Sequence, residues 1–322
     1  MSLTEFSVVA ATAESLTVIN LLAYMQVPLS ILIYRRVLAR PDPLFPEQID
    51  ALRFEQQVRV LTRWFRVLAL PDAVRRLRER TLPGRAACVA FENGYADNAA
   101  VALPILQRYR VPATFFVASG FLDGGCMWKD AVIDVVRSAP GEHLNLASSG
   151  FATYDLRCPV RRRAVIDMLI DTLGRLPHGE RLERIRTMAR SFAPTMMTSD
   201  EVLALHRAGM EIGAQTVSHP VLTAISNADA RAEIANGRAR LQEIIQAPVR
   251  LFAYPAGTPG QDFEVRHVHM LRSQGFDAAV TSSNGAARHD TDPMMLPRFT
   301  PPERGAPGLL LRMGCNLLRP PA

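Results

Sequence analysis

Short apolar runs alternate along the chain with stretches in which apolar residues recur at spacings of three and four. The runs predict strands at residues 29–34, 87–91, 113–117, 211–213, 249–254 and 278–281. The spaced pattern predicts helices at residues 53–64, 99–109, 228–245 and 265–274. Repeated alternation of strand and helix favours parallel pairing with both faces of the sheet covered, so we expect an α/β fold.

One stretch, residues 161–193, breaks this alternation. It is rich in arginine, has helical spacing and contains no run of strand type, so we interpret it as an inserted helical layer. The pattern therefore divides the chain into an apolar N-terminal extension at residues 1–28, a main domain at residues 29–304 and a C-terminal tail at residues 305–322.

The N-terminal extension admits two interpretations. Residues 15–34 carry no charge and precede two arginines, which fits a membrane anchor. However, acidic residues and no basic ones precede this stretch, unlike in a secretory signal. If residues 29–34 form the first strand, only the 14 residues 15–28 remain, too few to span a bilayer. We therefore expect a cytoplasmic protein, with membrane association through this segment as the alternative.

Composition and charge exclude several classes of protein. Of the 322 residues, 48% are hydrophobic and 21% are charged, which is typical of a globular protein with a large core. The net charge is +6, but the basic residues are scattered among acids, and Lys129 is the only lysine. This pattern predicts a solvated basic surface and no nucleic-acid partner. The four cysteines stand far apart and form no disulfide framework.

Polar residues that follow the predicted strands lie in four recognisable segments. VAFENGYADN, followed by a helix and VPATFFV, resembles the T-F-D-D-G-Y-x-D-N motif of the polysaccharide deacetylases, the NodB homology family. QTVSHPVL resembles that family's H-T-x-x-H-P-x-L motif, and VRLFAYPAG and DPMMLPRF resemble its third and fourth motifs. The segments stand in the family's order and cover about residues 30–300.

The resemblance implies a deformed (β/α) barrel of mostly parallel strands that removes acetyl groups from N-acetylated sugars. In such enzymes one Asp and two His hold a divalent metal, often zinc, which polarises the acetamide carbonyl and activates water. A neighbouring Asp serves as base, and a His elsewhere serves as acid. The implied cofactor is therefore zinc or another divalent metal, and the implied partner is an acetylated oligo- or polysaccharide.

At the centre of this pattern the sequence departs from the family. Glu92 stands at the position of the base, and Asn93 stands at that of the metal-binding Asp. Gln215 replaces the first metal-binding His, whereas His219 retains the second. The segment ILIYRRV resembles the family's I-x-Y-H-R-V, in which the His is the acid, and Arg35 occupies that position.

These replacements predict a metal site that is weak or absent. Amide oxygens offer neither the anion nor the imidazole that zinc prefers, and two such changes would remove on the order of 5 kcal/mol of metal affinity. Glu92 keeps a carboxylate, but a displacement of about 1 Å by its extra methylene can cost about a hundredfold in rate. Arg35 stays protonated at neutral pH and cannot deliver a proton.

Other polar positions of the motifs are retained. By the resemblance, Arg250 orients the base, and the backbone of the Tyr254-Pro255 turn faces the oxyanion. Asp292 and Arg298 belong to the fourth motif, and we expect them to contact substrate. For Arg250 a simple ion pair, and for the turn a purely structural role, are the alternatives.

Three functions are consistent with these residues. We interpret the chain as a protein of carbohydrate metabolism whose implied reaction, hydrolytic removal of acetyl groups, is impaired by the substitutions. The alternative is a non-catalytic carbohydrate-binding or scaffold protein built on the same barrel. Metal-independent hydrolysis with Glu92 as base is the least favoured.

Overall fold

The computed structural model describes residues 27–188, 193–301 and 306–318. The predicted extension at residues 1–28 lies outside these ranges except for its last two residues, of which Val27 packs against the core. None of the helices in the described parts has the length and apolar character needed to cross a membrane.

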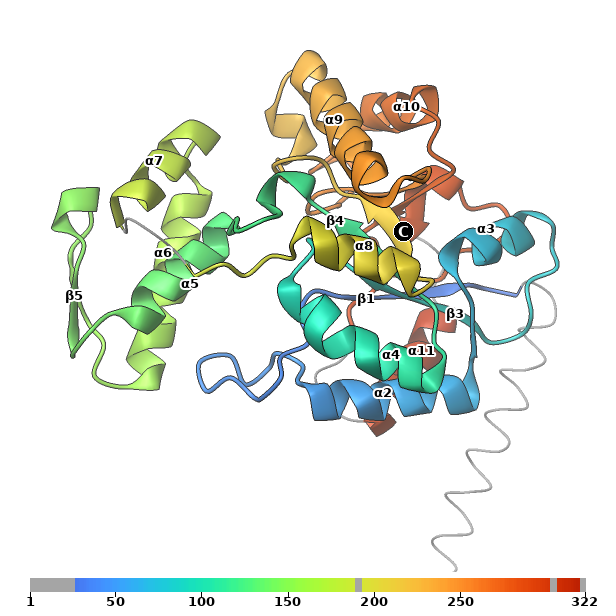
Figure 1. The fold of residues 1–322 in the computed structure, drawn as a ribbon, viewed down its shortest axis with the longest axis horizontal. Coiled ribbons are helices and arrows are strands. Elements are labelled where there is room, and N and C mark those ends of the chain that lie inside the picture. Colours follow the sequence, from blue (N-terminus) through green and yellow to red (C-terminus); the bar gives the residue numbers. More distant parts are fainter. Residues whose placement is uncertain (1–26, 189–192, 302–305, 319–322) are drawn as a thin grey trace, which may run out of the picture.

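A parallel sheet of eight strands forms the centre of the molecule (Figure 1). Its main path runs β1-β3-β4-β7-β8-β9-β10, with the short β2 attached beside β3. The strands are β1 Ser30–Tyr34, β2 Arg66–Val67, β3 Ala86–Phe91, β4 Ala113–Val117, β7 Glu211–Ala214, β8 Leu251–Ala253, β9 Ala278–Thr281 and β10 Leu296–Pro297. All of their ladders are parallel, as the alternation of strand and helix predicts.

Backbone hydrogen bonds bring the two ends of this path together. Phe299, just after β10, donates its N–H to the carbonyl of Ile31 at 3.0 Å, and its own carbonyl accepts from the N–H of Ile33 at 3.0 Å. The seven strands of the path therefore form a nearly closed, barrel-like parallel sheet, which confirms the predicted fold class. Sequence patterns missed β2 and β10 because two-residue strands are too short to show alternation.

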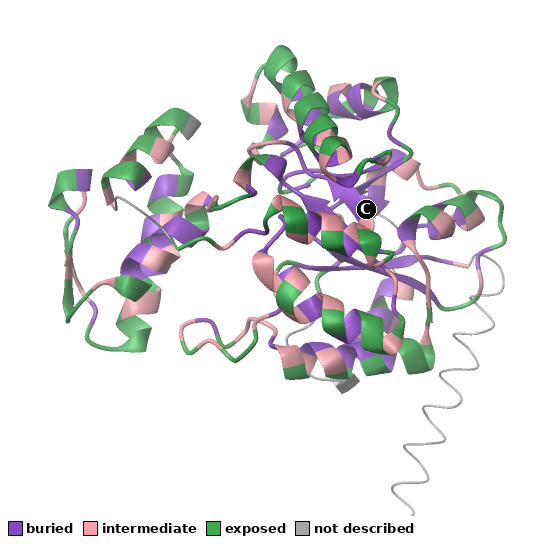
Figure 2. Cartoon of the chain, viewed as in Figure 1, coloured by how far each residue is buried: buried purple, intermediate pink, exposed green. Residues whose placement is uncertain are grey.

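Helices surround the sheet and cover its outer face. They are α2 Ala51–Trp64, α4 Leu103–Tyr109, α8 Ser199–Arg207, α9 Asn227–Ile245, α10 Val265–Ser273 and α11 Ala306–Leu318. A further helix, α3 Leu70–Arg78, packs against the opposite set of strand side chains. Side-chain caps start several of them: Asp50 accepts from the N–H of Arg53 at α2, and Thr198 and Glu201 form a capping box at α8. In Figure 2 the strands along the main path of the sheet are buried, and the helices around them expose their outward faces.

Alternation along each strand divides the core into two sets. Leu32, Val89 and Phe115 belong to a cluster shared with α2, α4, α9 and α10, on the outside of the sheet. Ile31 and Cys88 point the other way, into a cluster made of strand residues and α3. The second set includes many alanines, as expected where side chains converge inside a narrow barrel.

A separate helical layer stands beside the barrel, at the left of Figure 1. It contains α5 Trp128–Ser138, the antiparallel pair β5 His143–Asn145 and β6 Thr153–Asp155, α6 Pro159–Gly174 and α7 His178–Met188. These elements share a hydrophobic cluster of their own, centred on Val132, Ile166 and Leu169. Within the predicted helical stretch at residues 161–193 the structure describes α6 and α7, and it shows that the layer begins earlier, at α5.

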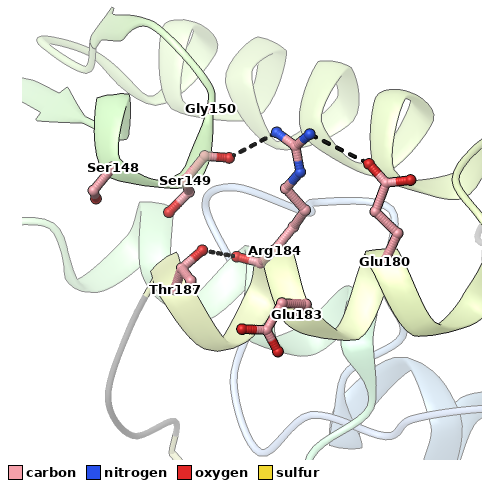
Figure 3. Close-up of a pocket in the computed structure, with 7 residues that line it drawn as sticks. All are labelled: Ser148, Ser149, Gly150, Glu180, Glu183, Arg184 and Thr187. Carbon is pink, nitrogen blue, oxygen red and sulfur yellow. Dashed lines mark hydrogen bonds and ion pairs between the residues drawn. The ribbon is translucent and has the colours of Figure 1, made fainter.

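An open polar hollow of about 270 Å³ lies within this layer (Figure 3). Arg184 spans it, with one terminal nitrogen on the carbonyl of Ser149 at 3.0 Å and the other 3.3 Å from the carboxylate of Glu180. The hollow contains none of the residues that the sequence motifs single out.

The predicted C-terminal tail at residues 305–322 requires correction. Residues 306–318 form α11, in which Leu309 and Met313 are fully buried in the same cluster as the outer strand residues. Asn316 donates a hydrogen bond to the hydroxyl of Ser30 in β1 at 3.0 Å. The segment is part of the domain, and its apolar residues at spacings of three and four were a helical signal that the sequence interpretation did not use.

Candidate functional site

The motif residues gather where parallel strands end. Arg35 follows β1, Glu92 follows β3, Gln215 follows β7 and Arg298 follows β10. Because all of these strands run in the same direction, their carboxyl ends meet at one end of the barrel. Residues separated by more than 250 positions in the chain therefore meet in one site.

Glu92 lies at the centre of this site between two arginines. Its Oε1 accepts from Nε of Arg35 at 2.7 Å, and its Oε2 lies 2.7 Å from a terminal nitrogen of Arg298. The side chains of Glu92 and Arg298 are 4% and 6% exposed, whereas that of Arg35 is 68% exposed. A buried carboxylate is thus held by one buried and one solvent-facing guanidinium.

This pairing controls the charge of Glu92. Burial tends to raise the pKa of the carboxyl, but the charges of Arg298 and Arg35 outweigh it and hold the pKa below the ordinary value. A carboxylate with a lowered pKa and a cation on each oxygen is a poor proton acceptor.

Asn93 and Gln215 contact each other directly. The backbone N–H of Asn93 donates to Oε1 of Gln215 at 2.8 Å, and both side chains are buried. Asn93 and the following Gly94 have φ values of 77° and 89°, which turn the chain sharply after the strand. A Cβ on Gly94 would stand 2.9 Å from the side chain of Val117 in β4, so the turn needs glycine for space as well.

His219 lies in the loop after β7, which hydrogen bonds hold in shape. Its N–H donates to the hydroxyl of Thr216 at 3.0 Å, and both residues have positive φ. Burial lowers the pKa of His219 to about 4, although the carboxylate of Glu92 acts in the opposite direction. The imidazole is therefore neutral at pH 7.

Glu233 of α9 anchors this loop, and sequence reasoning missed it. Its carboxylate accepts from the N–H groups of Val217 at 2.9 Å and Ser218 at 2.8 Å, and from the hydroxyl of Ser218 at 2.8 Å. Glu233 lies on a helix with no motif around it, so only the tertiary contact identifies its role.

Asp97 joins the loop after β3 to the end of β1. Its carboxylate accepts from Nε of Arg36 at 2.7 Å and from the N–H of Val37 at 3.1 Å. The guanidinium of Arg36 also lies 4.9 Å from the centre of the Tyr95 ring. These contacts fix the two loops that carry Arg35 and Glu92 relative to each other.

Two predicted site residues, Arg250 and Asp292, make contacts other than the expected ones. Arg250 precedes β8 and therefore lies at the opposite end of the barrel, where its nearest carboxylate is that of Asp277 at 3.7 Å. The structure does not bring it to Glu92, and Arg298 takes the position expected for it. Asp292 precedes β10; its carboxylate pairs with Arg272 at 2.5 Å and accepts from the N–H of Met294.

The Tyr254-Pro255 turn has no free backbone donor. The N–H of Tyr254 donates to the carbonyl of Val280 at 3.2 Å, and proline has no N–H. The ring of Tyr254 is fully buried against Phe263, with 3.7 Å between ring centres, and its hydroxyl donates to the carbonyl of Met294 at 3.1 Å. In this arrangement neither Tyr254 nor Pro255 has a backbone N–H free to donate to an oxyanion.

The donor atoms at the strand ends do not fit a zinc ion. The only side-chain oxygen of Gln215 already accepts from Asn93, and its other terminal atom is an N–H donor, which cannot bind a metal. The Glu92 carboxylate is paired with two guanidinium groups. Within the described ranges, no three His, Cys, Asp or Glu side chains lie close enough together to hold a metal ion.

Comparison with known proteins identifies relatives of this arrangement. The family model described as polysaccharide deacetylase matches residues 79–152 and 188–279, together more than half of the chain. The gap between the two matches lies in the helical layer. No curated protein matches the chain.

Solved structures share the fold over most of their length. The deacetylase PplD of Streptococcus pyogenes, in complex with acetate, is 17% identical, with a TM-score of 0.61 over 89% of this chain and 99% of that chain. IcaB from Ammonifex degensii is 20% identical, with a TM-score of 0.60 over 89% and 97%. A de-N-acetylase from Aggregatibacter actinomycetemcomitans is 14% identical, with a TM-score of 0.54 over 88% and 99%.

Proposed function

The chain belongs to the polysaccharide deacetylase family, and from this premise we propose that its site binds an acetylated oligo- or polysaccharide without metal-dependent removal of the acetyl group. The hydrogen bond from the N–H of Asn93 to Oε1 of Gln215 carries this proposal. The N–H needs an acceptor, so the Gln215 amide cannot turn its oxygen elsewhere without leaving a buried donor unpaired, at a cost of about 1–3 kcal/mol.

Charge supports the same conclusion. The family pattern places two carboxylates side by side, whereas this chain has the neutral Asn93 next to Glu92. Glu92 forms an ion-paired triad with Arg35 and Arg298. The triad has two positive charges and one negative charge, so it repels a divalent cation. The same pairing argues against hydrolysis with Glu92 as base, because a water molecule would have to displace a guanidinium from the carboxylate.

Saccharide binding needs neither the metal nor the base. Hydrogen-bond donors at the strand ends remain available to a sugar, above all the solvent-facing guanidinium of Arg35. A second candidate function, deacetylation with an atypical metal site, is favoured by one observation only: the low pKa of His219 keeps the imidazole neutral, which is the form that binds zinc.

Metal affinity distinguishes these two functions. We expect the wild-type protein to bind zinc weakly in calorimetric titration, because two of the three ligand positions are amides. Asn93→Asp together with Gln215→His restores a carboxylate and an imidazole beside His219, and zinc affinity should rise by about ten thousandfold. Asn93→Asp alone should have little effect, since the shell remains incomplete.

The matched control places the same changes on the exposed surface. Asn236→Asp with Gln246→His alters two exposed residues of α9 and its C-terminal cap, and it should leave zinc affinity unchanged. Stoichiometric zinc in the wild-type protein, together with acetate release from chitin oligosaccharides that Glu92→Ala abolishes, would establish the atypical enzyme instead.

Ligand binding is measured separately with a neutral chitin tetrasaccharide. Binding by the metal-free wild-type protein, without release of acetate, supports the proposal. If no acetylated saccharide, neutral or charged, is bound or deacetylated at millimolar concentration, the proposed function is wrong.

A further inference from the structure

The rim of the site is cationic. Arg35 uses only its Nε for the bond to Glu92, and its terminal nitrogens make no hydrogen bond among the described residues. Its side chain is 68% exposed, so this planar pair of nitrogens faces solvent. A free guanidinium edge has the geometry that binds a planar anionic group through two parallel hydrogen bonds.

A second cation belongs to the same rim. Lys129 lies in the first turn of α5, is exposed, and its ammonium group has no ion pair within the described ranges. Contacts around Tyr95 bring this turn to the site: the Tyr95 hydroxyl lies 3.8 Å from Sδ of Met127, and Arg36 covers the ring. Partial burial lowers the pKa of Lys129, and the charge of Arg35 lowers it further.

The acids of this cluster are largely shielded from solvent, and two of the three, Glu92 and Asp97, are ion-paired. Glu92 is held by Arg298 from beneath as well as by Arg35, and Asp97 is held by Arg36. Asp130 is 8% exposed, and burial raises its pKa. A ligand entering from solvent therefore meets Arg35 and Lys129 first.

We propose that the saccharide bound at this site is acidic, and that a carboxylate on one of its sugars pairs with the terminal nitrogens of Arg35, with Lys129 as a second positive charge beside it. This inference rests on the proposed saccharide-binding function and specifies its ligand. Sulfate offers a similar set of anionic oxygens, so the test includes both groups.

Three tetrasaccharides that share an N-acetylated sugar separate the possibilities. The first alternates glucuronate with N-acetylglucosamine, the second is a sulfated keratan fragment without carboxylate, and the third is neutral chitin tetrasaccharide. We expect calorimetry at low ionic strength to show about tenfold tighter binding of the uronate ligand than of the neutral one, equivalent to one charge-assisted hydrogen-bond pair. The difference should shrink as salt is added.

The outcomes distinguish this inference from the function on which it rests. Tighter binding of either anionic ligand than of chitin supports an anion-binding rim, and the ratio of the two identifies the preferred group. Equal affinity for all three ligands overturns the inference but leaves saccharide binding intact. Binding of none of them overturns both.

Single substitutions test which residues are responsible for the preference for the uronate ligand. Arg35→Gln should remove the preference for the uronate ligand, and Lys129→Gln should reduce it by about threefold. Arg35→Lys keeps the charge without the planar pair of nitrogens and should retain only part of the preference. Arg175→Gln is the matched control, since it removes an exposed arginine at the C-terminal cap of α6 that pairs with Asp171, and it should change nothing.

Two measurements distinguish a variant that has lost the ligand preference from one that fails to fold. Each variant is compared with wild type by thermal midpoint and by affinity for the neutral ligand. Lys129 makes no ion pair among the described residues, so Lys129→Gln tests the rim even if Arg35→Gln unfolds. A wild-type preference that survives both substitutions contradicts the assignment.

Discussion

The residues at the strand ends form an ion-paired centre around Glu92. Glu92 is nearly inaccessible, and its two oxygens contact guanidinium groups from β1 and β10. A buried carboxylate without such partners would cost several kcal/mol. Arg35 and Arg298 therefore allow Glu92 to remain charged inside the barrel, and in return they occupy the oxygens that a catalytic base would need.

His219 makes the stability of the domain depend on pH. Its pKa is about 4 in the folded protein, below the 6.5 of an unperturbed histidine. Between these values the unfolded chain binds more protons than the folded one, so the free energy of unfolding falls as pH falls. We expect the contribution of His219 to decrease by about 1–2 kcal/mol between about pH 7 and pH 5.

Urea unfolding at the two pH values measures this effect. His219→Gln stays neutral throughout, so the variant should lose less stability than wild type on going from neutral to mildly acidic solution. His206→Gln, in the last turn of α8, is the control and should follow wild type. Identical pH dependence in all three proteins would show that His219 is not shielded from protonation.

At the scale of elements, α9 determines the shape of the loop that carries Gln215 and His219. Glu233 binds the loop through two N–H groups, and Gly237, one turn later, lets the helix approach closely. A Cβ at Gly237 would stand 2.6 Å from the carbonyl carbon of Thr216, a backbone atom that cannot move alone. The glycine is therefore required by the site, although it weakens the helix.

Gly237→Ala should destabilise the protein, although replacing glycine by alanine inside a helix usually stabilises it. Alanine is the better helix former by about 1 kcal/mol, yet the clash with Thr216 should make the variant about 1–3 kcal/mol less stable. Gly314→Ala in α11 is the control, because a Cβ there meets nothing within 4 Å, and it should be neutral or stabilising. Chemical denaturation measures both, and a stabilised Gly237→Ala protein would contradict the tight approach of α9.

At the scale of the whole molecule, α11 completes the core. Leu309 and Met313 are fully buried in the cluster that includes α2 and the outer faces of the strands. The helix also reaches β1 through the bond from Asn316 to Ser30. The last helix thus covers the first strand of the barrel, and both ends of the described chain contribute to one core.

Truncation tests this role. A chain that ends at residue 301 should lose cooperative unfolding, because it exposes the buried residues covered by α11. In the full chain, Leu309→Ala should cost about 2–5 kcal/mol. Leu311→Ala is the control, since that side chain is 71% exposed, and its cost should be below about 0.5 kcal/mol. A truncated protein with unchanged thermal unfolding would restore the interpretation of this segment as a tail.

Some of the site could be predicted from local patterns and some could not. An apolar run that ends in polar residues predicts the carboxyl end of a strand and locates Glu92, whereas the resemblance to the family's second motif locates Gln215. Arg250 was assigned to the same site from its motif, but it precedes its strand, and residues at opposite ends of a strand cannot share a site. The resemblance to the third motif singles out Arg250, but the direction of β8 determines at which end of the barrel this arginine lies.

The sequence by itself determined the alternation of strands and helices, the parallel barrel and the positions of the altered motif residues, because these depend on side-chain period and order along the chain. Only the tertiary structure decided that Arg298 pairs with Glu92, that Glu233 anchors the His219 loop and that α11 belongs to the core. Each of these contacts joins two segments whose local sequence patterns do not indicate that they meet. Their pairing depends on how the barrel closes and how its helices pack.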